Sequence, residues 1–427
     1  MTIQPDSPPP RKRGERVRNA GLVIVALERG VIKARAVPIP PQPAPAEEAR
    51  ASRYYIPELD VLRLFAFLSV FFFHVPPGSV MEWHPGVART AVSAGSLGVD
   101  LFFTLSAYLI TKLLLQERER EGRVDVKSFY IRRVLRIWPL YYFFLAIAAG
   151  LATFGGRFSV TPSYMMSLAV FSGNYGIIKA FGNPTRWHAN LLVGPLWSVS
   201  VEEQFYLLWP LALRRLSRRG VAIAALAMLV LTSLDRFRAI ELGYLGIPFP
   251  IVTKLFYLDS FAVGILIAVI PIPDWITNLS IFQRLGLAIA GILAWFLAVH
   301  FGDYLTTAPT LVQTMLSYPA VAIGSGAMLL AALGAGRAGA AFMLNERLRY
   351  LGKISYGLYV YHGLAIALAQ VLVLGGAYQA QSPFQGAVYV AAALAITVLI
   401  AAASYRWLES PFLRMKDRFT HVPSRPV

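Results

Sequence analysis

Long apolar segments constrain this chain more than any other feature of its sequence. A helix needs about 20 apolar residues to cross the hydrocarbon core of a bilayer, and several segments approach or reach that length. Hydrophobic residues make up 56% of the 427 residues and charged residues 15%, against roughly 25% charged residues in soluble domains. The sequence therefore predicts an all-α, polytopic integral membrane protein.

We expect a bundle of about ten transmembrane helices. An apolar stretch at 164–178 is too short for a comfortable span and contains Ser172, Gly173 and Asn174, so we interpret it as a re-entrant or interfacial segment. The ten helices are expected at 57–75, 97–115, 134–154, 196–213, 221–235, 252–270, 285–301, 311–334, 352–373 and 386–407.

Basic residues orient this bundle. With the N-terminus inside, 32 of the 40 Lys and Arg residues fall in segments expected on the inner side, and seven fall in outer segments. The positive-inside rule predicts this asymmetry, so both termini are expected in the cytoplasm. The same asymmetry accounts for the net charge of +17. We therefore expect the lipid bilayer, and no nucleic acid, as a partner.

The first 55 residues differ in composition from the rest. They are basic and Pro-rich and are expected to form a mostly disordered cytoplasmic arm, in which the apolar stretch from Gly21 to Leu27 can lie on the membrane as a helix. A cleaved secretory signal is the disfavoured alternative. Residues 56–414 are expected to form the helical domain, and 415–427 a short cytoplasmic tail. The absence of cysteine excludes disulfides and thiol nucleophiles.

The first expected helix carries Asp60, Arg63 and His74. Charged groups inside a membrane are costly and usually functional. At about 100° per residue, Arg63 and His74 share a face and Asp60 lies near it, so a polar stripe runs along the helix. Two alternatives stay open: an ion pair between Asp60 and Arg63 at a helix end, and an interfacial role for His74.

The fourth expected helix carries two adjacent carboxylates, Glu202 and Glu203. We expect one of them to orient or polarise His74, as base-orienting groups do. The alternative is a structural role, with one carboxylate protonated and the other paired with an arginine. Asp100 and Asp259 lie at a similar expected depth and are candidates to join this cluster.

The inner end of the third expected helix is rich in arginine. Arg132, Arg133 and Arg136 lie beside aromatic residues, and guanidinium groups suit a phosphate-bearing ligand. An ordinary positive-inside anchor is the alternative. His362, in the ninth helix, is either a buried hydrogen-bonded residue or a lining residue of a pathway. The histidines show no metal-ligand spacing, so no metal site is expected.

Seven segments, in this order, resemble the membrane-bound acyltransferase 3 family. They span residues 56 to about 414, nearly the whole membrane part, and the order is more specific than any one motif. The matching segments are Ile56 to Arg63 leading to His74, Gly98 to Ser106, Tyr130 to Pro139, Leu196 to Pro210, Leu258 to Gly264, Leu351 to His362, and Arg406 to Pro411.

The resemblance implies a ten-helix O-acyltransferase of a bacterial inner membrane. It implies acyl-CoA, commonly acetyl-CoA, as co-substrate, no bound cofactor, and a carbohydrate or glycosylated acceptor. It also implies an essential His74, a donor-binding role for the arginines, and a functional role for Glu202 and Glu203. Supporting residues within the matched segments are expected to be Asp60, Arg63, Asp100, Ser106, Trp197, Ser200, Asp259, Tyr356 and His362.

Other classes of protein fit the same residues. A multi-helix transporter or flippase without covalent chemistry would also carry intramembrane charges, but the sequence shows no inverted repeat of broken helices. A structural or acyl-sensing membrane protein would tolerate replacement of His74. Some family members carry a further C-terminal hydrolase-like domain. None is visible here, so we expect transfer directly to the acceptor or to a separate partner. The sequence is compatible with a homo-oligomer. It does not determine the chain length of the acyl group that is transferred.

Overall fold

The computed structural model describes residues 23–28, 31–36, 55–75, 86–154, 160–176, 192–241, 257–270, 276, 278–302, 310–336, 338–377 and 379–419. The chain divides into two units, Met1–Arg53 and Tyr54–Val427.

The described part of the first unit is a β-hairpin. Strand β1 (Val23–Glu28) pairs in antiparallel register with β2 (Val31–Ala36), and Glu28 lies opposite Val31. Runs rich in Val and Ile favour extended strands. The expected surface helix at Gly21 to Leu27 was therefore wrong for the five residues of it that the structure describes. The expected disorder of the rest of the arm lies outside the described residues.

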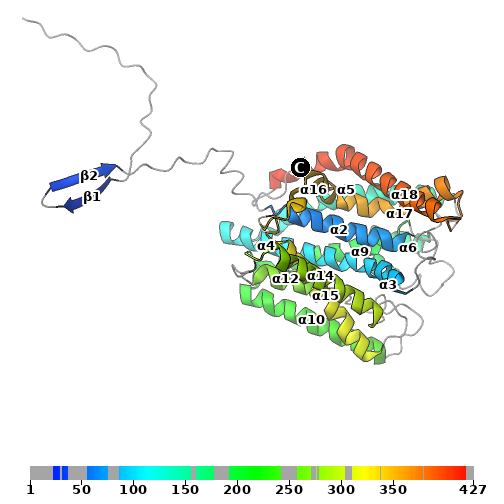
Figure 1. The fold of residues 1–427 in the computed structure, drawn as a ribbon, viewed down its shortest axis with the longest axis horizontal. Helices are drawn as coiled ribbons and strands as arrows, with labels where there is room; N and C mark the ends of the chain where they lie inside the picture. The colour runs from blue at the N-terminus through cyan, green and yellow to red at the C-terminus, as the bar shows by residue number, and fades with distance from the viewer. Residues whose placement is uncertain are drawn as a thin grey trace, which may run out of the picture. The chain divides into compact units, whose positions relative to one another are not determined.

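Within the described part of the second unit, every regular element is a helix, and Figure 1 shows α2 and α9 in the middle of the bundle, with α10 and α18 at opposite edges. The long helices are α2 (Glu58–His74), α4 (Gly98–Glu121), α5 (Val126–Ala152), α9 (Trp197–Arg215), α10 (Arg218–Glu241), α12 (Leu258–Val269), α14 (Ile281–His300), α15 (Leu311–Ala332), α17 (Ser355–Leu374) and α18 (Pro383–Ser404). The short ones are α3 (Val87–Ala94), η2 (Gly95–Leu97), α6 (Pro162–Ala169), η4 (Gly194–Leu196), η5 (Ala341–Leu344), α16 (Glu346–Lys353), the π-helix η6 (Tyr405–Glu409), α19 (Ser410–Lys416) and η7 (Asp417–Phe419).

A helix occupies each of the ten positions expected from the sequence. Seven helical segments among the described residues are long and apolar enough to cross a membrane, which supports an integral membrane protein. The other three expected spans correspond to α2 with 17 residues, α9 with two carboxylates, and α12 with 12 residues. The count of ten spans therefore stays a prediction. The segment expected to be too short to span contains α6, whose eight residues cover about 12 Å.

Two glycines allow α2 to be packed closely on either side. Gly98 begins α4 against the backbone carbonyl of Ala66, and a Cβ atom there would overlap that oxygen. Gly352 brings α16 against the Asp60 carbonyl in the same way. Because both neighbours are held at backbone contact distance, the side chains at the start of α2 are fixed relative to α4 and α16.

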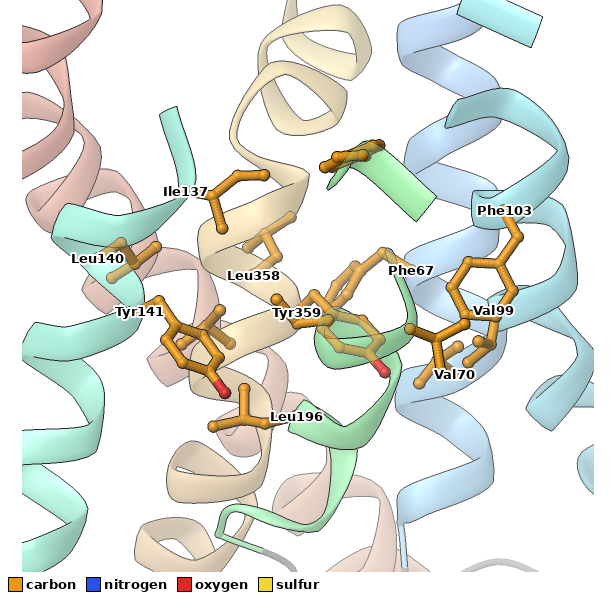
Figure 2. Close-up of a cluster of buried hydrophobic side chains, with 14 of the residues drawn as sticks. Phe67, Val70, Val99, Phe103, Ile137, Leu140, Tyr141, Leu196, Leu358 and Tyr359 are labelled. Atoms are coloured by element: carbon orange, nitrogen blue, oxygen red, sulfur yellow. The ribbon is translucent and has the colours of Figure 1, made fainter. Parts of the chain in front are cut away.

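Apolar side chains from several helices form the centre of the bundle. Figure 2 shows part of this cluster, with Tyr359 of α17 near its middle, and all its labelled residues are buried. Phe67 and Val70 come from α2, and Tyr141 comes from α5. The Tyr359 ring also meets the Phe102 ring of α4, with centroids 5.8 Å apart. Side chains of α2, α4 and α5 therefore gather around Tyr359, which matters for the site below.

Candidate active site

A cavity of about 190 Å³ lies inside the helical unit. Both Val99 and Glu117 line it, and their 18-residue separation on α4 corresponds to about 27 Å along the helix axis. The cavity is therefore long and narrow. Its charged lining residues are the basic Arg63, Arg132, Arg133, Arg136 and Lys416 and the acidic Asp60, Glu117 and Glu202.

The three expected donor-binding arginines all line this cavity, but their surroundings differ. Arg132 is already held, because it forms a 2.9 Å salt bridge with Glu117 and donates to the Phe419 carbonyl at 2.6 Å. Among the described residues, neither Arg133 nor Arg136 forms a salt bridge. Arg133 and Arg136 are therefore the members of the set best placed to meet an anionic ligand.

Aromatic rings hold the guanidinium group of Arg133. It lies 5.3 Å from the Phe129 ring centroid and 5.1 Å from that of Tyr206, and its buried Nε has no hydrogen-bond partner among the described residues. Burial, and then repulsion from Arg136, lowers the pKa of Lys353 on the neighbouring helix α16. This end of the bundle is suited to a phosphate-bearing group.

Asp60 and Arg63 form the ion pair that the sequence left open. Their side chains are 3.7 Å apart, and the Tyr55 hydroxyl donates to Asp60 at 2.7 Å. Both residues also line the cavity, so the pair is part of the wall as well as the start of α2.

The two adjacent carboxylates of α9 point in different directions, as neighbouring helical residues must. Glu202 lines the cavity and accepts hydrogen bonds from Ser106 on α4 and Tyr206 on α9. Glu203 accepts from the Trp138 indole at 3.1 Å, and its Oε1 is buried without a hydrogen-bond partner among the described residues. Glu202 is therefore the carboxylate that faces the cavity.

His74 lies beside another histidine. Its Nδ1 is 2.9 Å from the Val70 carbonyl and 3.2 Å from Nε2 of His362. The expected pairing of His74 with Glu202 or Glu203 is not the one found, and it was wrong because depth along a helix does not determine which neighbour faces a residue. The carboxylates of α9 contact α4, α5 and α9 itself, whereas α17 supplies the partner of His74.

Asp100 and Asp259 do not join His74 either. Asp100 accepts from the Ser260 hydroxyl at 2.7 Å. Asp259 forms a buried salt bridge with Arg236, whose guanidinium lies 3.9 Å from the Tyr318 ring centroid. These contacts connect α4, α10, α12 and α15, so neither of the two candidate aspartates joins His74 in a cluster.

The other expected supporting residues divide into cavity and packing roles. Tyr356 and Ser106 line the cavity, and the Tyr356 hydroxyl donates to the Ile137 carbonyl at 3.0 Å. Trp197 packs on Tyr257 with ring centroids 5.1 Å apart. The Ser200 hydroxyl accepts from the Gly173 amide at 3.1 Å.

The residues of the site that were missed from the sequence include Glu117, Ser198, Tyr206 and Tyr359. Tyr206 follows Glu202 by four residues, and Tyr359 precedes His362 by three, so helical spacing offered a signal for both. Glu117 and Ser198 gave no local signal. The Ser198 and Tyr359 hydroxyls are 2.6 Å apart and both line the cavity.

Comparison with known proteins identifies the family of this chain. A family model described as an acyltransferase domain matches residues 56–406. The chain belongs to the acyltransferase 3 family. In this acyltransferase 3 protein, the matched region contains all the lining residues of the cavity except Tyr55 and Lys416.

Curated relatives include proteins named for O-acetyl transfer. The chain is 26% identical to the peptidoglycan O-acetyltransferase OatA of Listeria monocytogenes, over 85% of this chain and 56% of the relative. It is 26% identical to the O-acetyltransferase OatA of Staphylococcus aureus, over 88% and 60%. It is 28% identical to the putative peptidoglycan O-acetyltransferase YrhL of Bacillus subtilis, over 84% and 55%. The aligned part thus spans little more than half the length of these relatives. No solved structure matches the chain.

Proposed function

We propose that this protein is a membrane-bound O-acyltransferase that moves an acyl group, acetyl in the first instance, from acyl-CoA to a hydroxyl group of a carbohydrate. The observation that carries the proposal is the long cavity that joins Arg133 and Arg136 to the hydrogen-bonded group of Ser106, Glu202 and Tyr206. Arginines suit the phosphates of coenzyme A, and a narrow cavity suits its extended thioester arm.

In the proposed reaction His74 acts as the general base. The acceptor hydroxyl gives its proton to the imidazole while its oxygen attacks the thioester carbonyl carbon. The carbon–sulfur bond then breaks, and the coenzyme A thiolate leaves and takes up that proton. His74 as an acyl carrier is the alternative, in which the same ring nitrogen attacks the carbonyl first. Holding donor and acceptor together supplies the proximity that either route needs.

The two substrates are proposed to come from opposite sides of the membrane. The excess of basic residues in the segments expected inside supports a cytoplasmic donor and a bacterial inner membrane. Two of the relatives are named for peptidoglycan, which supports a cell-envelope carbohydrate as the acceptor. The transporter alternative gains no support from membership in a family of acyltransferases.

The test is thioester cleavage by the purified protein in lipid nanodiscs, with acetyl-CoA labelled in the acetyl group and with water or an added sugar hydroxyl as the acceptor. We expect release of coenzyme A by the wild type, and a rate at least about 100-fold lower after His74→Ala. His300→Ala is the matched control, because His300 is exposed on α14 and contacts Thr90. A correctly folded wild type that neither binds nor cleaves any short acyl-CoA would overturn the proposed function.

A further inference from the structure

The imidazole rings of His74 and His362 are in contact. Their centroids are 4.9 Å apart, and Nε2 of His362 lies 3.2 Å from Nδ1 of His74. A neutral imidazole has one nitrogen that donates a hydrogen bond and one that accepts. Each hydrogen-bond contact of the two rings therefore restricts which nitrogen carries the proton.

The restriction starts at a backbone carbonyl. The Tyr359 carbonyl oxygen lies 2.5 Å from Nδ1 of His362 and can only accept, so Nδ1 of His362 carries a proton. Its Nε2 is then an acceptor. That acceptor faces Nδ1 of His74, which must donate. The Val70 carbonyl, 2.9 Å from the same Nδ1, is a second acceptor that shares this N–H, so it adds to the preference without fixing the tautomer alone.

We propose that His362 is a positioning residue that holds His74 in the tautomer with a proton on Nδ1 and a free electron pair on Nε2. The catalytic use of this electron pair rests on the proposed function. The tautomer itself follows from the hydrogen-bond contacts alone. The opposite tautomer would turn the Nδ1 electron pair of His74 toward both the Val70 oxygen and Nε2 of His362. The three-centre hydrogen bond from the single Nδ1–H to these two acceptors would be lost and replaced by repulsion.

A neutral partner suits this location. His362 is fully buried, and its ring meets the edge of Phe67 with centroids 6.3 Å apart. A carboxylate in the same place would bring a charge into an apolar part of a membrane protein, which is costly. When Nε2 of His74 takes a proton, the two acceptors at Nδ1 stay in place and stabilise the cation without a permanent charge beside it.

The surroundings of Tyr359 keep this arrangement rigid and connect it to the cavity. The Tyr359 hydroxyl lies 2.6 Å from the Ser198 hydroxyl and donates to the Pro195 carbonyl at 3.0 Å. The Tyr359 ring lines the cavity, while its carbonyl accepts from His362. The contacts thus run from the cavity wall through Tyr359 and His362 to His74.

The first test reads the tautomer directly and needs no activity. The protein is labelled with ¹⁵N in its histidine rings and examined by NMR in nanodiscs, with His74→Gln and His362→Gln used to assign the signals. We expect both rings as the Nδ1–H tautomer in the wild type, and a mixture for His74 after His362→Leu. A His74 ring with its proton on Nε2 in the wild type, or one unaffected by His362→Leu, would overturn the proposal.

The second test separates positioning from packing. In His362→Gln the amide oxygen can accept from His74 and the amide nitrogen can donate to the Tyr359 carbonyl, so we expect kcat within about 10-fold of the wild type. In His362→Leu we expect kcat to fall on the order of 100-fold, with KM for acyl-CoA nearly unchanged. His300→Leu is the control.

The outcomes distinguish the inference from the function on which it rests. Equal losses in the Gln and Leu variants, or a loss confined to KM, would contradict a positioning role. If the wild type shows no acyl transfer, the proposed function fails, and the NMR spectrum still decides the tautomer. Thermal unfolding of each variant identifies one that loses activity through misfolding, and the His362→Gln variant then carries the test.

Discussion

Two neighbouring arginines on α5 illustrate how surroundings assign a role to one residue. Arg132 is bound by Glu117 and by the Phe419 carbonyl, so its charge is largely committed to holding the protein together. Arg133 lies between two aromatic rings with no salt bridge among the described residues. Arg133 is therefore the better candidate for a contact with the phosphates of the proposed donor, acyl-CoA.

We expect Arg133→Lys to raise KM for acyl-CoA about 10-fold, the equivalent of about 1.4 kcal/mol, with kcat nearly unchanged. A lysine cannot form the two-pronged contact with a phosphate and does not stack on rings as a planar guanidinium does. Steady-state kinetics in nanodiscs measure both constants. The control is Arg214→Lys, at an exposed position on α9. An unchanged KM would remove Arg133 from the donor site.

The sequence predicted which residues carry the site better than it predicted their partners. Arg63 was expected as a supporting residue, the α5 arginines as donor-binding residues and Glu202 as a partner of His74. All of them line the cavity, although their roles stay predictions. The partner of His74 was not identified, because it lies 288 residues away on α17. Periodicity gives the face of a helix on which a residue lies, but packing decides which other helix covers that face.

Helix α16 can pack directly against the backbone of α2 because residue 352 is a glycine. Gly352 is buried, and a Cβ atom there would overlap the backbone of Asp60. Asp60 and Arg63 form part of the cavity wall in the same turn of α2. The contact between the two helices therefore sets the position of that wall.

We expect Gly352→Ala to destabilise the protein by about 1–3 kcal/mol, because the added methyl group must push α16 away from α2. Thermal unfolding in detergent, followed by tryptophan fluorescence, measures the effect. Gly286→Ala on α14 is the matched control, since nothing lies within 4 Å of a Cβ atom built there. The control should be neutral or slightly stabilising. Equal unfolding temperatures for the two variants would mean that the contact is loose.

The apolar middle of each long helix could be predicted from hydropathy, but the residues at which the helix begins and ends were predicted less well. The expected segment 97–115 became α4, which continues to Glu121, and 134–154 became α5, which begins earlier at Val126. Hydropathy marks the apolar part of a helix, while charged residues such as those at the end of α4 continue the same helix beyond it. The start of α5 is fixed by a local signal, because Asp125 accepts a hydrogen bond from the Ser128 amide.

At the scale of the whole molecule, the orientation in the membrane is open to a direct test. The chain contains no cysteine, so a single introduced cysteine can be labelled without background. We expect Ser217→Cys, between α9 and α10, to be protected from a membrane-impermeant maleimide in intact cells. We expect Gln381→Cys, between α17 and α18, to react. Both positions are exposed, and the positive-inside rule places them on opposite sides.

Permeabilised cells provide the control, in which both cysteines should react. The reverse pattern in intact cells would place the arginine-rich end of the cavity outside the cytoplasm. Coenzyme A could then not enter from the cytoplasm, and the proposed direction of transfer would have to be abandoned. Labelling of both positions in intact cells would contradict the odd number of spans, five, expected between the two sites.

The cavity wall includes residues from both ends of the helical unit. Tyr55 precedes α2, whereas Lys416 ends α19, and Arg132 of α5 binds the carbonyl of Phe419. The ribosome makes these residues in that order, so α2 and α5 enter the membrane long before their neighbours from α19 exist. Until the C-terminal residues have been synthesised, the arginines of α5 lack the part of the cavity wall that Lys416 provides and the carbonyl of Phe419 that binds Arg132. A chain that stops before residue 410 would therefore contain all ten expected helices and still lack part of the wall of the proposed donor site.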